Sequence, residues 1–176
     1  PRVIFFGAIA AYKQAWRVLD SFLEMPAGQA ALVICGKMSD RSPDLRLCDA
    51  LENLPEERVP EIIVEDRFLP EEELIGRIRA ADLVVLPYGE VLNSGAALFA
   101  LSVGRPILAS DAPVFAELQD HVGAEWVRLI KEELDGHQLQ EALHAARALR
   151  TRGEVPDLSV YDWKTIGDET AAFYRR

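Results

Sequence analysis

The chain has 176 residues, with 29 acidic and 19 basic side chains and a formal net charge of −10. Its length suits one α/β domain, and a hydrophobic fraction of 49% supports a packed core rather than a disordered polymer. The excess of negative charge argues against general binding to nucleic acid or to an anionic membrane, because every phosphate contact would work against it.

The two cysteines, Cys35 and Cys48, have neither the number nor the spacing of a disulfide framework or a metal site, and they indicate a reducing compartment. No stretch approaches the roughly 18 consecutive apolar residues of a membrane span. We therefore expect a cytoplasmic protein, with peripheral attachment to the inner face of the membrane as an open alternative. Because the chain starts at Pro1 without a Met or a signal peptide, we expect a fragment cut at a domain boundary.

Six short apolar or β-branched runs predict strands. Several of them are continuously apolar, as expected for strands that are covered on both faces. The runs are Val3–Phe6, Ala31–Cys35, Glu61–Val64, Asp82–Leu86, Pro106–Ala109 and Trp126–Ile130.

The segments between these runs have helical spacing. Residues 14–24 carry an apolar stripe. Ser42 and Pro43 are expected to cap and open the next helix, with Leu45 and Cys48 facing inward. Pro70 followed by three glutamates predicts another start, since acids favour a first turn. Later helices are expected over 94–103, from Asp111 and Pro113 to Leu118, from Asp135 with Gln138 in a capping box, and from Asp162 to the end, after a polar connector over 151–159.

Alternation of strands and helices predicts an α/β fold with a Rossmann-like, doubly wound, six-stranded parallel sheet and right-handed crossovers. In such sheets ligands bind in the crevice beyond the carboxyl ends of the strands. Chemistry is therefore expected in the turns that lead from a strand into a helix.

The first of these turns runs from Gly7 to Lys13. A glycine at the end of a strand permits a sharp turn and the close approach of a ligand. A cation near the start of a helix is unfavourable for the helix dipole, and pairing with a phosphate would explain Lys13. An exposed surface lysine is the alternative.

The second turn runs from Pro87 to Gly95. Asn93 or Ser94 is expected to cap the following helix, and Gly95 would let a diphosphate reach the first free amides. Glu90 is placed to accept hydrogen bonds from sugar hydroxyls. An ordinary loop before an ordinary capped helix would explain the same residues.

Other chemistries lack their signatures in this sequence. The Walker loop, the G-x-G-x-x-G fingerprint and the G-x-S-x-G elbow are absent. The histidines at 121, 137 and 144 do not form a ligand set, and the acidic run Glu71–Glu73 does not direct its side chains to one place. We expect no metal site.

Taken in order along nearly the whole chain, these segments resemble the C-terminal domain of GT-B glycosyltransferases, specifically the retaining family 4 group. The first strand with Gly7 and Lys13 is similar to that family's strand–Gly–x5–Lys opening, and residues 81–88 look like its "a-D-l-v-v-l-P" strand. Further family elements are matched by residues 31–36, 68–74, 104–110 and 162–163.

The resemblance implies a domain that binds a UDP- or GDP-sugar donor without a bound metal or other cofactor. The lysine and the amides of the second turn would contact the diphosphate, and the main chain around 67–69 would hold the base. Glu90 and Lys13 are the implied catalytic residues. The implied binding residues are Gly7, Lys13, Arg67, Phe68, Leu69, Asn93, Ser94 and Gly95.

Three positions depart from the family pattern. Ala8 stands where the family usually has an arginine, so one cation for the diphosphate is missing. The E-x7-E motif falls on Val91 and Phe99, with Glu90 one place off. An aromatic ring at position 99 cannot accept hydrogen bonds from ribose hydroxyls.

Three functional hypotheses follow. The first is a retaining hexosyltransferase of polysaccharide biosynthesis, with residues 1–160 as the donor-binding domain and 161–176 as a helix that packs back toward a missing N-terminal domain. That domain would bind a glycan or lipid-linked acceptor, and the fragment alone would bind donor without turning it over.

The second hypothesis is a catalytically inactive GT-B-like binding or scaffold module, motivated by Ala8 and Phe99. The third is an enzyme with other sugar-nucleotide chemistry, such as epimerisation.

Overall fold

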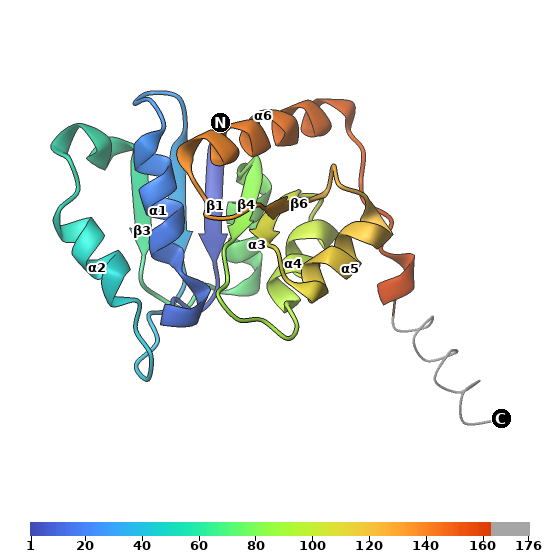
Figure 1. Ribbon diagram of the computed structural model, residues 1–176, viewed down its shortest axis with the longest axis horizontal. Helices are drawn as coiled ribbons and strands as arrows, with labels where there is room; N and C mark the ends of the chain where they lie inside the picture. Colours follow the sequence, from blue (N-terminus) through green and yellow to red (C-terminus); the bar gives the residue numbers. More distant parts are fainter. Residues whose placement is uncertain (163–176) are drawn as a thin grey trace.

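The computed structural model describes residues 1–162, which form one six-stranded parallel sheet flanked by helices (Figure 1). The strand order is β3-β2-β1-β4-β5-β6, and every neighbouring pair is parallel. The direction of winding reverses between β1 and β4, which confirms the predicted Rossmann-like, doubly wound sheet. The strands are β1 (Arg2–Phe6), β2 (Ala31–Cys35), β3 (Ile62–Glu65), β4 (Leu83–Leu86), β5 (Ile107–Ser110) and β6 (Val127–Ile130).

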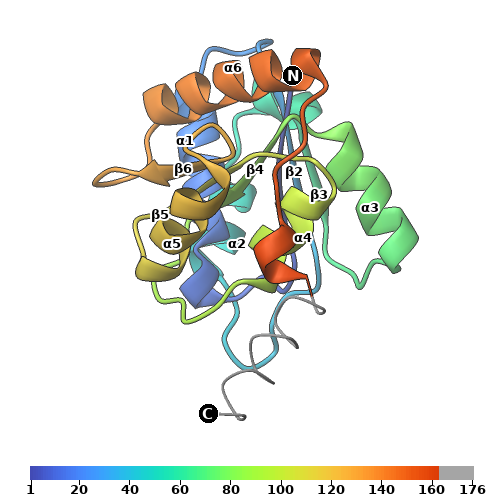
Figure 2. The same ribbon diagram turned by 90° about the vertical axis from the view of Figure 1, so that its right-hand side faces the viewer.

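Helices connect consecutive strands and cover both faces of the sheet. α1 packs against α2 and α6 on one face, and α3 and α4 lie on the other side of the strands from α1 (Figure 2). None of the helices described within residues 1–162 combines the length and apolar character needed to cross a membrane. The helices are α1 (Ala15–Glu24), α2 (Leu45–Glu52), α3 (Glu71–Ala80), α4 (Gly95–Ser102), α5 (Pro113–Val122) and α6 (Gly136–Arg152), with short 3-10 helices η1 (Ala11–Lys13), η2 (Glu56–Glu61) and η3 (Ser159–Tyr161).

The continuous apolar runs of the central strands are explained by burial on both faces. Val3, Ile4 and Phe5 of β1 have no exposed surface, and all four residues of β4 are buried. All six predicted strands are present, and each begins and ends within one residue of the expected position. Asp82 precedes β4 rather than opening it, and its carboxylate accepts a hydrogen bond from the amide of Arg2 and pairs with Arg150.

The start of α2 differs from the prediction. Its cap is Asp44, not Ser42, and the Asp44 carboxylate accepts from the amides of Leu47 and of Trp16 in α1. The inward face also differs from the prediction, since Leu47 is buried, whereas Leu45, the first residue of the helix, is exposed. One buried carboxylate therefore holds the first turns of two helices together.

The caps and ends of the later helices α5 and α6 also differ in detail from the prediction. Pro113 is the first residue of α5, but no side chain caps this helix, and it reaches Val122 rather than Leu118. Asp135 caps α6 through the amide of Gln138, whereas the Gln138 side chain donates to the carbonyls of Lys131 and Glu133. The predicted capping box is therefore half formed, and α6 extends to Arg152, into the predicted connector.

The predicted last helix and its residues Trp163, Ile166 and Phe173 lie outside the described residues, apart from its first position at Asp162. The division into a domain over 1–160 and a helix over 161–176 stays a prediction.

Candidate functional site

The loops that follow β1 and β2 run in contact at the carboxyl edge of the sheet, toward which the β1 arrow points in Figure 1. The amide of Gly7 donates to the carbonyl of Cys35 at 3.0 Å, and Ile9 bridges to Met38. A Cβ on Gly36, whose φ is +144°, would collide with the carbonyl oxygen of Gly7. Close contact of two backbones therefore requires glycine at position 36 and leaves a main-chain surface at the switch point.

A cavity of about 370 Å³ lies beside this surface, between η1 and the start of α4. We call it the lysine cavity. It brings together five residues that the sequence singled out, although Lys13 comes from the first turn and the others from the second. Its lining residues are Tyr12, Lys13, Tyr88, Glu90, Val91, Leu92, Asn93, Ser94, Gly95 and Ala96.

The Lys13 ammonium is half-buried and has no carboxylate within ion-pair distance among residues 1–162. It lies 5.2 Å from the ring centroid of Tyr88 and 6.0 Å from that of Tyr12. Burial lowers the pKa of Lys13. Two aromatic faces compensate part of the lost hydration, and an anion in the cavity would compensate the rest.

The first turn of α4 supplies the amides. Ser94 is the cap, and its hydroxyl accepts from the amide of Ala97 at 3.2 Å, as the sequence allowed. The amides of Gly95 and Ala96 have no acceptor within residues 1–162. Unpaired amides at the positive end of a helix dipole attract an anion.

The loop between β4 and α4 leaves the lysine cavity open. Glu90, Leu92 and Asn93 are exposed, so the segment does not fold inward to fill the hollow. Glu90 lines the cavity together with Lys13, as expected for a side chain that meets the same ligand.

A second cavity, of about 270 Å³, lies along the ends of β1, β2 and β3. We call it the base cavity because the predicted base-binding segment lines it with mostly apolar groups. Phe68 is 81% exposed at its rim, and Leu69 is buried. The Arg67 guanidinium is held by Glu73 and Glu65, and the Arg67 amide donates to the Glu65 carbonyl. The amides of Phe68 and Leu69 have no acceptor within residues 1–162 and are left for a ligand. Its lining residues are Gly7, Ala8, Cys35, Gly36, Lys37, Arg67, Phe68, Leu69 and Leu74.

The two cavities meet at Gly7 and Lys13. A Cβ on Gly7, whose φ is +102°, would lie 3.2 Å from the Lys13 ammonium nitrogen. All nine residues predicted for the site therefore fall into two adjoining cavities, one polar and one mostly apolar.

The departures from the family pattern have visible consequences. Ala8 lines the base cavity and carries no charge. Val91 lines the lysine cavity, whereas the Phe99 ring packs edge-on against Phe6 with centroids 6.1 Å apart. Position 99 therefore contributes packing at the end of β1 and offers no oxygen to a ribose.

Tyr88 is a site residue that the sequence did not single out. It is 4% exposed, and its hydroxyl has no hydrogen-bond partner of good geometry within residues 1–162. Burial raises the pKa of Tyr88, an effect that the neighbouring Ser94 hydroxyl partly offsets, so the phenol stays a neutral donor. The signal available in the sequence was a tyrosine shortly after the apolar strand β4, in a turn where chemistry was expected.

Known proteins resemble this chain in sequence and in fold. A family model described as "Glycosyl transferases group 1" matches residues 1–148. The chain is 34% identical over 166 residues to a GDP-mannose:glycolipid 4-beta-D-mannosyltransferase of Xanthomonas campestris pv. campestris, an alignment that covers 94% of this chain and 46% of the relative. The chain thus spans about half the length of the curated relatives that it matches.

Solved structures share the fold. Sucrose-phosphate synthase from Thermosynechococcus elongatus aligns with a TM-score of 0.70 and 21% identity, over 99% of this chain and 45% of that one. Anabaena HepE in complex with UDP aligns with a TM-score of 0.67 and 15% identity, over 97% and 48%. The C-terminal domain of a glycosyl transferase group 1 family protein from Francisella tularensis aligns with a TM-score of 0.60 and 18% identity, over 86% and 84%. The resemblance to the C-terminal domain of GT-B glycosyltransferases is thereby confirmed, and the chain belongs to the glycosyl transferases group 1 family.

Proposed function

We propose that the chain is the donor-binding half of a glycosyltransferase that moves a sugar from a nucleoside-diphosphate sugar to a glycan or lipid-linked acceptor. One observation carries the proposal: the Lys13 ammonium and the free amides of Gly95 and Ala96 converge on one cavity, next to the base cavity. A diphosphate would satisfy both kinds of donor, and the adjoining apolar walls suit a planar base.

The same groups would assist the chemistry. When the glycosidic bond to the diphosphate breaks, the leaving group gains negative charge, which Lys13 and the α4 amides would stabilise. A well-placed donor of this kind contributes about 3 kcal/mol to transition-state stabilisation in oxyanion holes. Glu90 would accept hydrogen bonds from hydroxyls of the donor sugar, because it is the carboxylate that lines the same cavity.

The donor class follows from the relatives. Those that match over 94% of this chain are named GDP-mannose:glycolipid mannosyltransferases. We therefore propose a GDP-linked hexose as donor and a glycolipid as acceptor, with UDP as the competing nucleotide because a structural neighbour was solved with it. A lipid-linked acceptor would place the enzyme at the inner face of a membrane.

Retention of anomeric configuration stays a prediction from the family resemblance. The β linkage in the name of the relatives favours inversion if their donor is α-linked. The one-bond C1–H1 coupling of the transferred sugar, measured by NMR on the product of the longer enzyme, decides between the two outcomes.

Calorimetric titration of the 176-residue chain with GDP, UDP and ADP tests donor binding. We expect heat with GDP, loss of that heat in Lys13→Ala, and wild-type heat in Lys131→Ala, an exposed lysine outside both cavities. No heat with any of the three nucleotides at millimolar concentration would overturn the proposal.

The alternative of an inactive binding module rests on Ala8 and Phe99. It predicts that the longer protein binds GDP without hydrolysing or transferring any donor sugar. Turnover that disappears in both Lys13→Ala and Glu90→Ala would exclude it. The expected independence of a metal is tested by activity measured before and after chelation with EDTA.

A further inference from the structure

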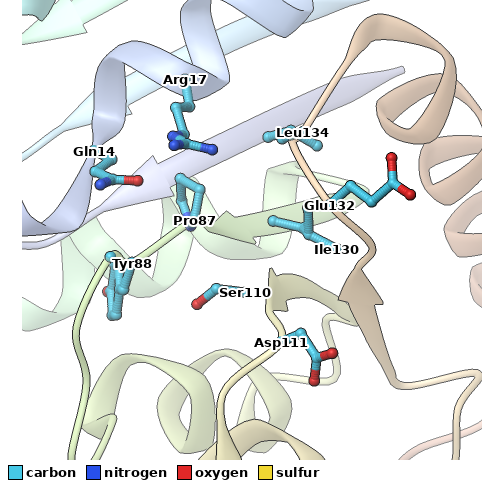
Figure 3. Close-up of a pocket in the computed structure, with 10 residues that line it drawn as sticks. Gln14, Arg17, Pro87, Tyr88, Ser110, Asp111, Ile130, Glu132 and Leu134 are labelled. Carbon is cyan, nitrogen blue, oxygen red and sulfur yellow. The ribbon is translucent and has the colours of Figure 1, made fainter.

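A third cavity, of about 360 Å³, opens beside the lysine cavity and shares Tyr88 with it. We call it the arginine cavity. Since β4, β5 and β6 are neighbours in the sheet, the segments that follow them meet here, and the start of α1 adds Gln14 and Arg17 (Figure 3). Its volume lies in the range of about 300–1,000 Å³ that is usual for small-molecule sites. The proposed donor site uses none of its other side chains.

Besides the Tyr88 hydroxyl, two polar groups of this cavity are left without partners within residues 1–162. The Oγ of Ser110 and the Nε of Arg17 are buried and make no hydrogen bond within residues 1–162. Arg17 reaches Glu133 at 3.7 Å, but that carboxylate is 87% exposed, so the pair is weak. Buried donors and hydroxyls are normally paired, so these two are candidates for contacts with a ligand.

The backbone around the cavity is unusual as well. Within residues 1–162 two non-glycine residues have a left-handed backbone, Gln14 with φ 53° and Glu132 with φ 63°, and both line the arginine cavity. Such conformations persist where the surroundings enforce them, and they are concentrated at ligand sites. The Gln14 amide also packs against Gly89, where a Cβ would lie 2.6 Å from its nitrogen.

The mixture of groups indicates the ligand class. The guanidinium and the amide donate hydrogen bonds, the Asp111 carboxylate accepts them, and Pro87, Ile130 and Leu134 add apolar surface. A neutral pyranose offers hydroxyls at its edge and C–H groups on its faces, so it matches such a lining. An oxyanion would meet the carboxylate of Asp111 in a chain of net charge −10.

We propose that the arginine cavity is a carbohydrate subsite that takes a neutral sugar of the acceptor, next to the donor site. The proposal rests on the proposed function for its biological meaning. The two are separable, because donor binding depends on Lys13 and sugar binding depends on Arg17 and Ser110.

Saturation-transfer NMR on the 176-residue chain tests the subsite, with methyl glycosides of glucose, mannose and galactose as probes and saturating GDP present. We expect transfer to at least one glycoside, with affinity lowered about tenfold by loss of a charged donor in Arg17→Gln and lowered also in Ser110→Ala. Arg46→Gln is the matched control, because Arg46 and Arg17 both stack on Trp16, whereas Arg46 does not line the cavity. Each variant is first shown by thermal unfolding to keep the wild-type fold.

Absence of transfer to all three glycosides, or equal transfer in wild type and Arg17→Gln, would overturn the subsite. Binding of inorganic phosphate that depends on Arg17, with no binding of the glycosides, would also overturn it in favour of an anion site. If Arg17→Gln keeps the heat of GDP binding and Lys13→Ala loses it, donor binding is intact at its own site. A failure to bind glycosides would then overturn the subsite without affecting the donor proposal.

Discussion

The ammonium of Lys13 lies 3.2 Å from the point that a Cβ on Gly7 would occupy. Gly7→Ala therefore combines two effects, an unfavourable backbone at φ +102° and pressure on the ammonium. We expect a loss of about 1–2 kcal/mol in unfolding free energy from the backbone and weaker GDP binding from displacement of Lys13. Gly28→Ala is the control, since φ is +79° with nothing within 4 Å of the new Cβ. It should lose stability but keep GDP affinity, and equal GDP affinity in both variants would contradict this view.

Because of Lys13, both the free energy of unfolding and the affinity for GDP should change with pH in the alkaline range. Its lowered pKa means that the folded chain holds this proton less tightly than the unfolded chain, so the charged lysine destabilises the fold at neutral pH. The free energy of unfolding should therefore rise as pH increases from the lowered pKa of Lys13 in the folded chain toward the ordinary value of 10.5 in the unfolded chain. A diphosphate prefers the charged form, so GDP affinity should fall over the same window.

Substitution separates the two effects of Lys13. Lys13→Met should unfold at a higher temperature than wild type without GDP and should lose the stabilisation that GDP gives, as measured by thermal unfolding with and without nucleotide. Lys131→Met should behave like wild type. A Lys13→Met variant that is less stable than wild type in the absence of GDP would refute the assignment of an incompletely compensated charge.

Phe68 offers a test of the base cavity that stability does not complicate. Its ring is 81% exposed, so Phe68→Ala should change the free energy of unfolding by less than about 0.5 kcal/mol. If the ring stacks on the base, GDP affinity should fall by about tenfold, since such stacking contributes ~1–3 kcal/mol. Leu45→Ala removes another exposed apolar side chain, on α2, and should leave affinity unchanged. Unchanged affinity in Phe68→Ala would remove the ring from the site.

The shared cap at Asp44 predicts a larger loss than an ordinary cap. Asp44 accepts from two amides in two helices, whereas Asp135 accepts from one. Asp44→Ala should cost about 2 kcal/mol of unfolding free energy and Asp135→Ala about 1 kcal/mol. Urea denaturation measures both, and a smaller loss at Asp44 than at Asp135 would show that its burial outweighs its hydrogen bonds.

The strands and most helix starts could be predicted because their signals are local. A continuous apolar run such as the one that forms β4 reports burial on both faces, and Ser94 and Asp135 are residues that favour caps whatever surrounds them. Asp44 also favours a cap, but it was missed because Ser42 followed by Pro43 gives a competing local signal. Its second partner, Trp16, lies 28 residues away and is not visible in the sequence. A cap that serves two helices depends on how the helices pack, and the hydrophobic periodicity of the sequence carries no information about that packing.

The site was predictable as a set of turns but not as a set of cavities. Lys13 and Ser94 belong to the lysine cavity, and Gly7 and Phe68 belong to the base cavity. Assigning them in this way requires the strand order, which places distant turns side by side. Ser110 lies in a turn after a strand, where chemistry was expected, but nothing in the sequence singled out Ser110 or Arg17 within their segments. Their importance depends on missing partners, and a missing partner is visible only when every neighbour is placed.

Tyr88 belongs to the walls of both the lysine cavity and the arginine cavity. A molecule that shifts this ring from one side alters the space on the other, which gives the two binding events a coupling free energy. Thermodynamic linkage makes that coupling equal in both directions, so donor and acceptor would help or hinder each other by the same factor, whichever arrives first.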